Sequence, residues 1–261
     1  MPNKDFLTLH TKDLPYFRAF LRAVESYFYQ DIDLAVPTLD VGCGDGNFTE
    51  LTFDRKLDVG LDPWWPPIRE AVTRDVYHIL TQADGAVMPF QDATFGSAIS
   101  NSVLEHIPHI DSVLVETARV MKPGAIFAFC VPNDLFNPNL SIAKMLDNAG
   151  LKSMADAYRR FFTKIARHIH LDGPAVWEKR LNDAGFTVEK HWNYFPPSSL
   201  AILEWGHYFG LPSLITRKLF GRWIIARTEW NLGWLVNYLR PHANPVPCDD
   251  GVCTFYIARR K

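Results

Sequence analysis

The chain has 261 residues, of which 48% are hydrophobic and 21% are charged, and its formal net charge at pH 7 is -2. This composition is typical of a globular protein and excludes collagen-like and largely disordered chains. The small net charge gives no reason to expect a nucleic-acid partner.

The cysteines, Cys43, Cys130, Cys248 and Cys253, are few for a chain large enough to bury a core, which is typical of a reducing compartment. Charges interrupt the apolar residues of segment 1–17, so it lacks the continuous apolar run of a signal peptide. No apolar stretch approaches the ~20 residues that would span a bilayer. We therefore expect a cytoplasmic protein that is soluble or at most rests on a membrane surface, with free buried thiols at Cys248 and Cys253.

Short runs rich in Val, Ile and Phe alternate with stretches of helical periodicity, a pattern typical of βαβ units and a parallel sheet. The first predicted helix covers residues 16–29, where Phe17, Phe20, Leu21 and Val24 share one face. Strands are predicted near 37–41, 56–61, 76–80, 96–100 and 125–131. Further helices are predicted near 48–53, 67–73 and 111–121.

Beyond residue 131 the pattern changes. Residues 133–170 predict one or two added helices, and 174–184 predict a helix that ends before Gly185. The last two predicted strands are 186–194 and 252–258. The stretch between them is too long for a hairpin loop and predicts a helical insertion or lid.

Segment 38–50 reads TLDVGCGDGNFTE, a buried-strand pattern that runs into three alternate glycines and a helix start. Gly42, Gly44 and Gly46 allow a tight turn and let a ligand approach bare main chain. A plain glycine-rich turn between strand and helix is the alternative.

A second predicted strand ends in Asp62, about 20 residues after the first glycine, a spacing at which a carboxylate can accept hydrogen bonds from both ribose hydroxyls. A nicotinamide-dependent dehydrogenase would share this acid. Its fingerprint is GxGxxG, however, and Asn47 stands where the last glycine would be. The spacing therefore favours an adenosyl ligand without a pyrophosphate.

Several motifs follow one another in a fixed order. They are LDVGCGDG at 39–46, GLD at 60–62, ADG at 83–85, MPF at 88–90, NSVLEHI at 101–107 and RVMKPG at 119–124. In this order the sequence resembles the class I S-adenosylmethionine-dependent methyltransferases, in particular the branch called methyltransferase type 11 or ubiquinone-biosynthesis-like. The resemblance covers residues 36–131 well and 173–194 more loosely.

The resemblance implies a cofactor role for each matching position. These positions are Asp40, Gly42, Cys43, Gly44, Gly46, Asp62, Pro63, Asp84, Gly85, Asn101 and Ser102. Asp40 and the glycine-loop backbone would hold the methionine part, Asp62 the ribose, and Asp84 the adenine amine with Gly85 leaving room beside the ring. Asn101 and Ser102 would border the reactive methyl group. The alternatives are a solvated loop carboxylate at Asp62 and a helix N-cap at Asp84.

Two positions depart from the family pattern. The family commonly has Phe-Asp where this chain has Phe95-Gly96, and Lys-Pro-Gly-Gly where this chain ends in Gly124-Ala125. Neither position contacts the cofactor in the resemblance, so the departures concern the subfamily.

His106 is a candidate general base, because a histidine at the mouth of the site could take a proton from an acceptor hydroxyl. Leu-Glu-His is common in the resembling family across unrelated substrates, which favours a structural role instead. Positioning of acceptor and methyl group in line could supply most of the rate. His168 and His170 lack the partners of a metal site, so no metal is expected.

The stretch 195–251 mixes aromatic residues with cations. Its aromatic residues include Trp205, Tyr208, Phe209, Phe220, Trp223, Trp230, Trp234 and Tyr238, and its cations Arg217, Lys218, Arg222, Arg227 and Arg240. Three interpretations stay open: aromatic side chains that pack the insertion onto the sheet with cations facing water, an apolar lid over the acceptor, and contact with a membrane surface.

The resemblance implies a Rossmann-like α/β fold with a mostly parallel seven-stranded sheet whose last strand is antiparallel. We expect one methyltransferase domain over 1–261, with a core of 31–132, 173–194 and 252–261. Helical insertions at 133–172 and 195–251, together with the N-terminal helix, would roof the active site as a lid.

The implied activity transfers the methyl group of S-adenosylmethionine to a small organic acceptor, apolar, aromatic or lipid-linked, with S-adenosylhomocysteine as product. The acceptor is expected between the cofactor methyl group and Asn101, His106, Asn133, Tyr194 and Trp205. Two rival functions remain: an NAD-dependent dehydrogenase, and a non-catalytic cofactor-binding protein that uses 195–251 to bind a partner or membrane. The sequence leaves the methylated atom and the oligomeric state open.

Overall fold

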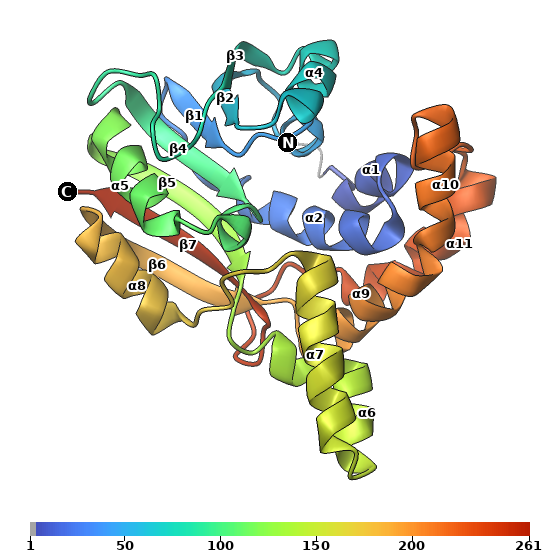
Figure 1. Cartoon of the computed structure of the whole chain (residues 1–261). Coiled ribbons are helices and arrows are strands. Elements are labelled where there is room, and N and C mark those ends of the chain that lie inside the picture. Colours follow the sequence, from blue (N-terminus) through green and yellow to red (C-terminus); the bar gives the residue numbers. More distant parts are fainter. Residues whose placement is uncertain (1–3) are drawn as a thin grey trace.

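The computed structural model describes residues 4–261, which fold around a seven-stranded sheet of order β3-β2-β1-β4-β5-β7-β6 (Figure 1). The strands are β1 (Thr38–Val41), β2 (Leu57–Asp62), β3 (Tyr77–Gln82), β4 (Phe95–Asn101), β5 (Met121–Pro132), β6 (Phe186–Tyr194) and β7 (Cys253–Arg260). β1 to β5 pair in parallel, and β7 runs antiparallel between β5 and β6. The predicted fold class is confirmed.

The helices divide between the faces of the sheet and its carboxyl edge. They are α1 (Phe6–Asp13), α2 (Tyr16–Phe28), α3 (Asn47–Thr52), α4 (Trp65–Arg74), α5 (Ile110–Val120), α6 (Ser141–Asn148), α7 (Lys152–Ala166), α8 (Pro174–Asp183), α9 (Pro197–Phe209), α10 (Leu211–Phe220) and α11 (Glu229–Leu239). Short 3₁₀ turns occur at η1 (Leu104–His106), η2 (Asn137–Asn139) and η3 (Arg240–His242). Figure 1 shows α1, α2 and α9–α11 beside the carboxyl ends of β4 and β5, where a ligand of such a sheet binds.

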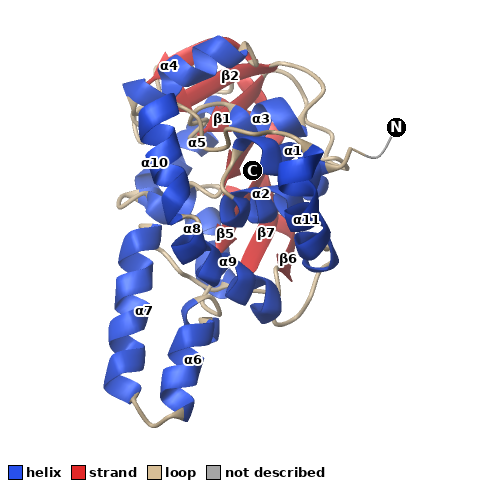
Figure 2. Cartoon of the chain, turned by 90° about the vertical axis from the view of Figure 1, so that its right-hand side faces the viewer, coloured by secondary structure: helices blue, strands red, loops and turns tan. Residues whose placement is uncertain are grey.

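Apolar side chains form two buried clusters. One contains α5 and α8 residues such as Leu114 and Trp177, together with Phe129 of β5. The other joins Phe20 of α2 to residues of both insertions, including Phe162 and Leu203. The insertions therefore share a core with α2 rather than hanging free, although the α6–α7 hairpin projects beyond it (Figure 2).

The observed elements differ from the sequence-based prediction in two places. Helix α1 was not predicted, because charged residues interrupt its apolar positions; it buries Phe6 and Leu7 against α2. The first residues of the expected N-terminal addition, 1–3, lie outside the described residues. Strand β5 begins at Met121, four residues before the predicted start, and passes a left-handed Gly124 and an irregular pairing with β4.

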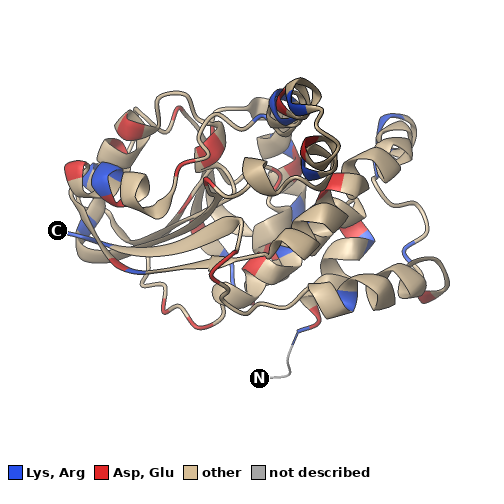
Figure 3. Ribbon diagram, turned by 90° about the horizontal axis from the view of Figure 1, so that it is seen from below, with Lys and Arg blue, Asp and Glu red and all other residues tan. Residues whose placement is uncertain are grey.

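No helix within residues 4–261 has both the length and the apolar character needed to cross a bilayer. Acidic and basic residues are mixed along the elements in the view of Figure 3, in keeping with the small net charge.

Gly96 of β4 shows why one family position has changed. A Cβ atom added there would lie 2.7 Å from the Val36 carbonyl oxygen and 2.9 Å from that of Ala35. Backbone atoms cannot move aside as a flexible side chain can. The segment before β1 therefore excludes the aspartate that the family commonly carries at this position.

We expect Gly96→Ala to lower the free energy of unfolding by about 1 to 3 kcal/mol, the usual cost of overpacking. Gly124→Ala is a matched control for strain alone, because its Cβ would meet no atom within 4 Å. Urea unfolding of both variants tests this. An unchanged midpoint for Gly96→Ala would contradict the clash.

Candidate functional site

The loop between β1 and α3 has the conformation that its glycines predict. Gly42, Gly44 and Gly46 all have positive φ, at 81°, 55° and 73°. A Cβ at Gly42 would lie 2.3 Å from Val103 Cγ1, whereas one at Gly44 would meet nothing within 4 Å. The loop thus packs on one side and presents open main chain at Gly44.

Asp62 at the end of β2 holds this loop. Its Oδ2 accepts a hydrogen bond from the Gly44 N–H (3.1 Å), and its Oδ1 accepts one from the Trp64 N–H (2.9 Å). Burial raises the pKa of the carboxyl, and the two N–H groups oppose that shift. A carboxylate has about four acceptor sites, so Asp62 keeps capacity for a ligand. Cys43 lies buried in the loop, and Pro63 follows Asp62 at an exposed position.

Asp40 lies under the loop. Its Oδ2 accepts hydrogen bonds from the hydroxyls of Tyr77 (2.6 Å) and Thr49 (2.9 Å). Burial raises the pKa of Asp40 to about 6, against these two bonds. The residue therefore connects β1 to α3 and β3, and its predicted contact with the methionine part of the cofactor stays a prediction.

Asp84 follows β3 in an exposed turn. Its Oδ1 accepts hydrogen bonds from the Ala86 N–H (2.9 Å) and from His109 Nε2 (3.1 Å). These two bonds lower the pKa of the carboxyl. A Cβ at Gly85 would approach Val113 of α5 to 3.1 Å, so this glycine serves close packing. Asp84 caps no helix in the described chain, so the N-cap alternative is wrong, and its contact with adenine remains a prediction.

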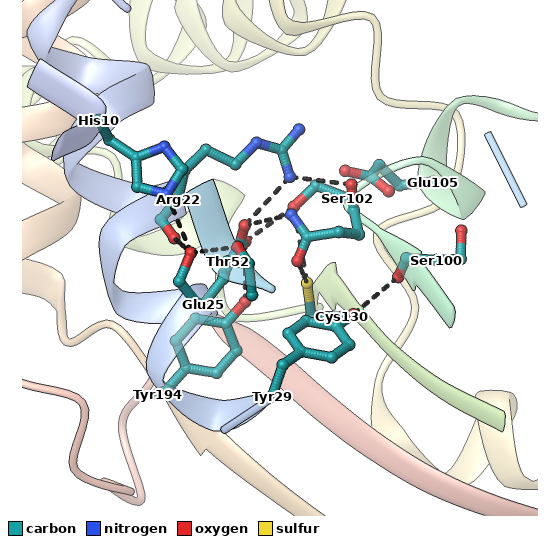
Figure 4. A network of polar contacts seen from close by, with 12 residues as sticks. His10, Arg22, Glu25, Tyr29, Thr52, Ser100, Ser102, Glu105, Cys130 and Tyr194 are labelled. Atoms are coloured by element: carbon teal, nitrogen blue, oxygen red, sulfur yellow. Dashed lines mark hydrogen bonds and ion pairs between the residues drawn. The ribbon is translucent and has the colours of Figure 1, made fainter. Parts of the chain in front are cut away.

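Glu25 of α2 is the centre of a buried polar network at the carboxyl edge of the sheet (Figure 4). Its Oε2 accepts hydrogen bonds from Asn101 Nδ2 (2.7 Å) and Arg22 Nη1 (3.1 Å). Its Oε1 accepts hydrogen bonds from the hydroxyls of Ser102 (2.8 Å) and Tyr194 (3.0 Å). The four bonds occupy the acceptor sites of the carboxylate, so Glu25 positions its neighbours rather than binding a ligand.

The network fixes the residues that follow β4. Arg22 Nη1 also donates to the Asn101 carbonyl oxygen (2.8 Å), and Cys130 Sγ donates to Asn101 Oδ1 (3.1 Å). Ser102 has a positive φ of 48°, which is uncommon for a residue with a side chain. Strained backbone of this kind is found where a site must be shaped. The structure thus brings together three predicted site residues, Asn101, Ser102 and Tyr194.

Arg18 lies one turn before Arg22 on the same face of α2 and has no acidic partner within ion-pairing distance in residues 4–261. Its side chain is open to solvent, yet the surrounding protein and the guanidinium groups of Arg22 and Arg217 lower its pKa. It interacts electrostatically with Asp45 of the glycine loop and with His207 of α9. Charges of the glycine loop, α9 and α10 therefore act on Arg18.

His106 lies in η1, next to this region. Its Nδ1–H donates to the Arg167 carbonyl oxygen (2.9 Å), because a carbonyl can only accept, and this leaves Nε2 as the unprotonated nitrogen. Burial lowers the pKa of the imidazole; the hydrogen bond to the Arg167 carbonyl opposes this shift, and the charges of Arg22 and Arg167 add to it. Nε2 faces Glu105 Oε1 at 3.6 Å. The ring can accept a proton, and its role as a general base stays a prediction.

Glu105 is 2% exposed, and no hydrogen-bond donor in the described chain reaches its Oε2. Burial raises its pKa to about 8, so the side chain is mostly protonated at pH 7. Figure 4 shows its carboxyl group on the side of Arg22 away from Glu25.

Two predicted acceptor residues have other partners. Asn133 is fully buried; its Nδ2 donates to the Gly251 carbonyl (2.9 Å) and Thr254 Oγ1 (3.0 Å), and its Oδ1 accepts from the Leu135 N–H. Trp205 is 41% exposed on α9 and stacks on Phe209. The structure does not bring these two into the Glu25 network.

The histidines at 168 and 170 form no ligand pair. His170 Nε2 lies 3.0 Å from the Ile107 carbonyl oxygen, and His168 stacks on His106. The described residues contain no grouping of three or more His, Cys, Asp or Glu side chains suited to a metal ion.

The insertion 195–251 differs from the packing interpretation, in which aromatic residues face the sheet and cations face water. Arg217 pairs with Glu70 of α4, and Arg227 pairs with Asp13 of α1 (2.7 Å). The aromatic side chains that face outward are Trp205, Phe209, Phe220, Trp230, Trp234 and Tyr238, and aliphatic side chains of α10 are exposed as well. Aliphatic residues of α9 and α11, such as Leu203, do the packing. Cations therefore help to attach the insertion, and aromatic and aliphatic side chains form its outer surface.

Sequence reasoning missed the polar residues of α2. The apolar positions of this helix predict its packing face, whereas Arg18, Arg22 and Glu25 recur at spacings of four and three and so share a face of their own. The signal in the sequence is a stripe with two guanidinium groups beside the apolar stripe. It lies on a helix that is expected to roof the site, and so it indicates polar residues that face the site.

Glu105 makes stability depend on pH. The folded protein keeps a proton on this carboxyl up to about pH 8, whereas the ordinary value of 4.5 applies when the chain is unfolded. The unfolded state therefore binds fewer protons between these pH values, and stability falls as pH rises through that window. We expect Glu105→Gln to remove this fall.

The measurement is urea unfolding from pH 5 to pH 8, with the exposed Glu178→Gln as control. Between pH 5 and pH 8 the free energy of unfolding of the unsubstituted chain should fall by at least about 1.4 kcal/mol more than that of Glu105→Gln, because one pKa unit corresponds to this energy. Parallel curves for the two proteins would show that Glu105 is charged when folded.

Comparison with known proteins agrees with this geometry. The sequence model of a family described as a methyltransferase domain matches residues 39–129, which hold the glycine loop, Asp62, Asp84 and Asn101. A trans-aconitate 2-methyltransferase of Methylobacterium nodulans is 31% identical over 69% of this chain and 70% of its own. A sterol methyltransferase-like protein of Botryococcus braunii is 34% identical over 38% of this chain and 28% of its own.

Among solved structures, an S-adenosylmethionine-dependent methyltransferase of Thermotoga maritima matches with a TM-score of 0.56 at 14% identity. The match covers 97% of this chain and 91% of that one, and it concerns the fold alone. The family match and the trans-aconitate methyltransferase relative carry the assignment: the chain belongs to the class I S-adenosylmethionine-dependent methyltransferases and transfers the methyl group of that cofactor to a small molecule.

Proposed function

We propose that this methyltransferase acts on a small organic acid held beside Asn101 and Ser102, with Arg18 binding a carboxylate of the acceptor. The observation that carries the proposal is Arg18, a guanidinium that the protein partly desolvates and leaves without an acid. A cation in such a position favours an anionic ligand. The related trans-aconitate methyltransferases, by their name, act on an acid.

The cofactor would lie along the glycine loop. We propose that the Gly42–Gly46 backbone and Asp40 hold the methionine part, that Asp62 and Pro63 hold the ribose, and that Asp84 holds the adenine amine. The open main chain at Gly44 and the free acceptor sites of Asp62 support this placement. Asn101 and Ser102 would then border the methyl group, because they follow the neighbouring strand β4.

The chemistry asked of the chain is mainly positioning. S-adenosylmethionine supplies a methyl group on a good leaving group, so the protein has to align the acceptor atom with that group and exclude water. The Glu25 network fixes Asn101 and Ser102 for this purpose. A carboxylate acceptor arrives ionised and needs no base, whereas a hydroxyl acceptor would use His106 Nε2.

A second candidate acceptor is the apolar, aromatic or lipid-linked compound expected from the sequence. Aromatic rings of α2, α7 and α9 support it: Phe17 and Phe162 both contact His207, at 4.2 and 5.0 Å between ring centres. For the insertion 195–251 we also propose contact with a membrane surface, which rests on its outward-facing apolar residues. The shared core supports treating 1–261 as one domain.

The loop glycines separate folding from cofactor binding. Gly42→Ala places a Cβ against Val103 and should lower stability and cofactor affinity together. Gly44→Ala costs only the roughly 1 to 2 kcal/mol of left-handed strain, but it fills the open face where the cofactor would lie. We expect Gly44→Ala to lose at least tenfold in S-adenosylhomocysteine affinity by calorimetry. Unchanged affinity would move the cofactor off this loop.

Arg18→Gln tests the acceptor. Turnover of trans-aconitate and other small di- and tricarboxylates is measured for both proteins, with calorimetry of S-adenosylhomocysteine alongside. We expect KM for the acid to rise at least tenfold, with cofactor affinity changed less than threefold, because the charge faces the acceptor. Lys218→Gln, which removes a cation of the outer surface, is the control. Equal loss of cofactor affinity would assign Arg18 to the cofactor carboxylate, and no turnover of any acid would favour the apolar acceptor.

A further inference from the structure

Helix α10 is amphipathic with its apolar side facing away from the protein. The residues toward the protein are Ser213, Thr216 and Arg217, whose side chains bond to nearby carbonyls or to Glu70. The residues toward solvent are Leu211, Leu214, Ile215 and Leu219, all between 53% and 68% exposed. None of the ten residues of α10 is buried.

This outer face of α10 lies at the surface of the molecule. Figure 1 places α10 at the outer edge of the structure, and Figure 2, seen from that side, shows it in front. A surface helix normally turns its apolar stripe inward, and a contiguous exposed apolar patch marks an interaction site. The polar contacts of Thr216 and Arg217 hold α10 in the opposite orientation.

The charge around the outer face indicates what covers it. No Asp or Glu occurs between Trp205 and Thr228, and within residues 4–261 neither Lys218 nor Arg222 pairs with an acid. Both cations are exposed at the end of the apolar stripe. Apolar side chains flanked by free cations are the composition of a helix that lies in the interface of a membrane with anionic lipids.

A second copy of the chain fits less well. A two-fold contact through the outer face would bring the same patch of both chains together, and so Lys218 and Arg222 of one chain against those of the other. Such like charges repel, whereas lipid phosphates neutralise them.

We propose that the outer face of α10 binds the surface of membranes that contain anionic lipids, with Leu211, Leu214, Ile215 and Leu219 in the acyl boundary and Lys218 and Arg222 at the headgroups. This inference rests on the membrane contact given above as part of the proposed function and narrows it to one helix face and one lipid charge. It does not depend on which acceptor is methylated.

The experiment is co-flotation of the full chain with vesicles of phosphatidylcholine alone or with 30% phosphatidylglycerol. We expect binding to the anionic vesicles that is at least tenfold stronger than to the neutral ones and is weakened by high salt. Ile215→Glu with Leu219→Glu should reduce it at least tenfold, because two charges enter the apolar stripe. The control variant Val115→Glu with Val176→Glu adds the same charge at exposed positions on α5 and α8 and should keep most of the vesicle binding.

Lys218→Gln with Arg222→Gln should reduce binding to anionic vesicles and leave binding to neutral ones unchanged. If the unsubstituted chain fails to float with anionic vesicles, the inference is overturned. It is also overturned if the α5–α8 control variant loses as much vesicle binding as the α10 variant. Equal binding to both vesicle types overturns the anionic preference but leaves the broader membrane contact standing. A dimer that Ile215→Glu with Leu219→Glu dissolves would assign the face to a second copy. S-adenosylhomocysteine-induced thermal stabilisation, measured on every variant, reports separately on the methyltransferase site.

Discussion

The buried carboxylate of Glu25 is the constraint on which the site depends. A fully buried carboxylate is costly unless donors satisfy it, and here the donors come from α2 itself, from the end of β4 and from the end of β6. Removing any of these elements would leave the charge short of partners. The network therefore couples the position of α2 to the backbone of Asn101 and Ser102. Cooperative polar networks of this kind specify one geometry when every member is satisfied.

The glycine loop depends on a second set of carboxylates on the opposite side of the site. Asp62 takes N–H groups from the loop, and Asp40 takes hydroxyls from the helix and strand beneath it. Burial raises the pKa of both acids, which means that keeping their carboxylates ionised costs free energy. Their pKa values should therefore respond to the charge of a ligand bound at the loop. A cofactor that carries a sulfonium cation would offset the negative charge gathered there.

The sequence predicted what local patterns determine. Alternating apolar runs gave the strands, and three glycines with an acid after the next strand gave the loop and Asp62, which the structure places in direct contact. Helix α1 escaped because its apolar residues form no clear stripe and are buried only in the assembled fold, against α2, α3 and α11. The Glu25 network escaped for a different reason: its members are up to 169 positions apart in sequence, and only the strand order brings them together. The outward direction of the aromatic residues in 195–251 also required the fold, since composition cannot tell which face of a helix is covered.

The attachment of that insertion differs along its length. Helices α9 and α11 bury aliphatic residues such as Leu203 and Val236 in the α2 core, and Gly206 lets α9 approach Tyr16 and Phe17 closely. No residue of α10 is fully buried, and its contact with α4 is the partly exposed pair of Arg217 and Glu70; pairs at the surface contribute only about 0 to 1 kcal/mol. Helix α10 is thus the part of the insertion that is held least firmly. Local opening is least costly where few apolar contacts are lost, so α10 can move away from α4 while α9 and α11 keep their places. A surface that binds the outer face of α10 would therefore act on the least firmly attached helix of the insertion.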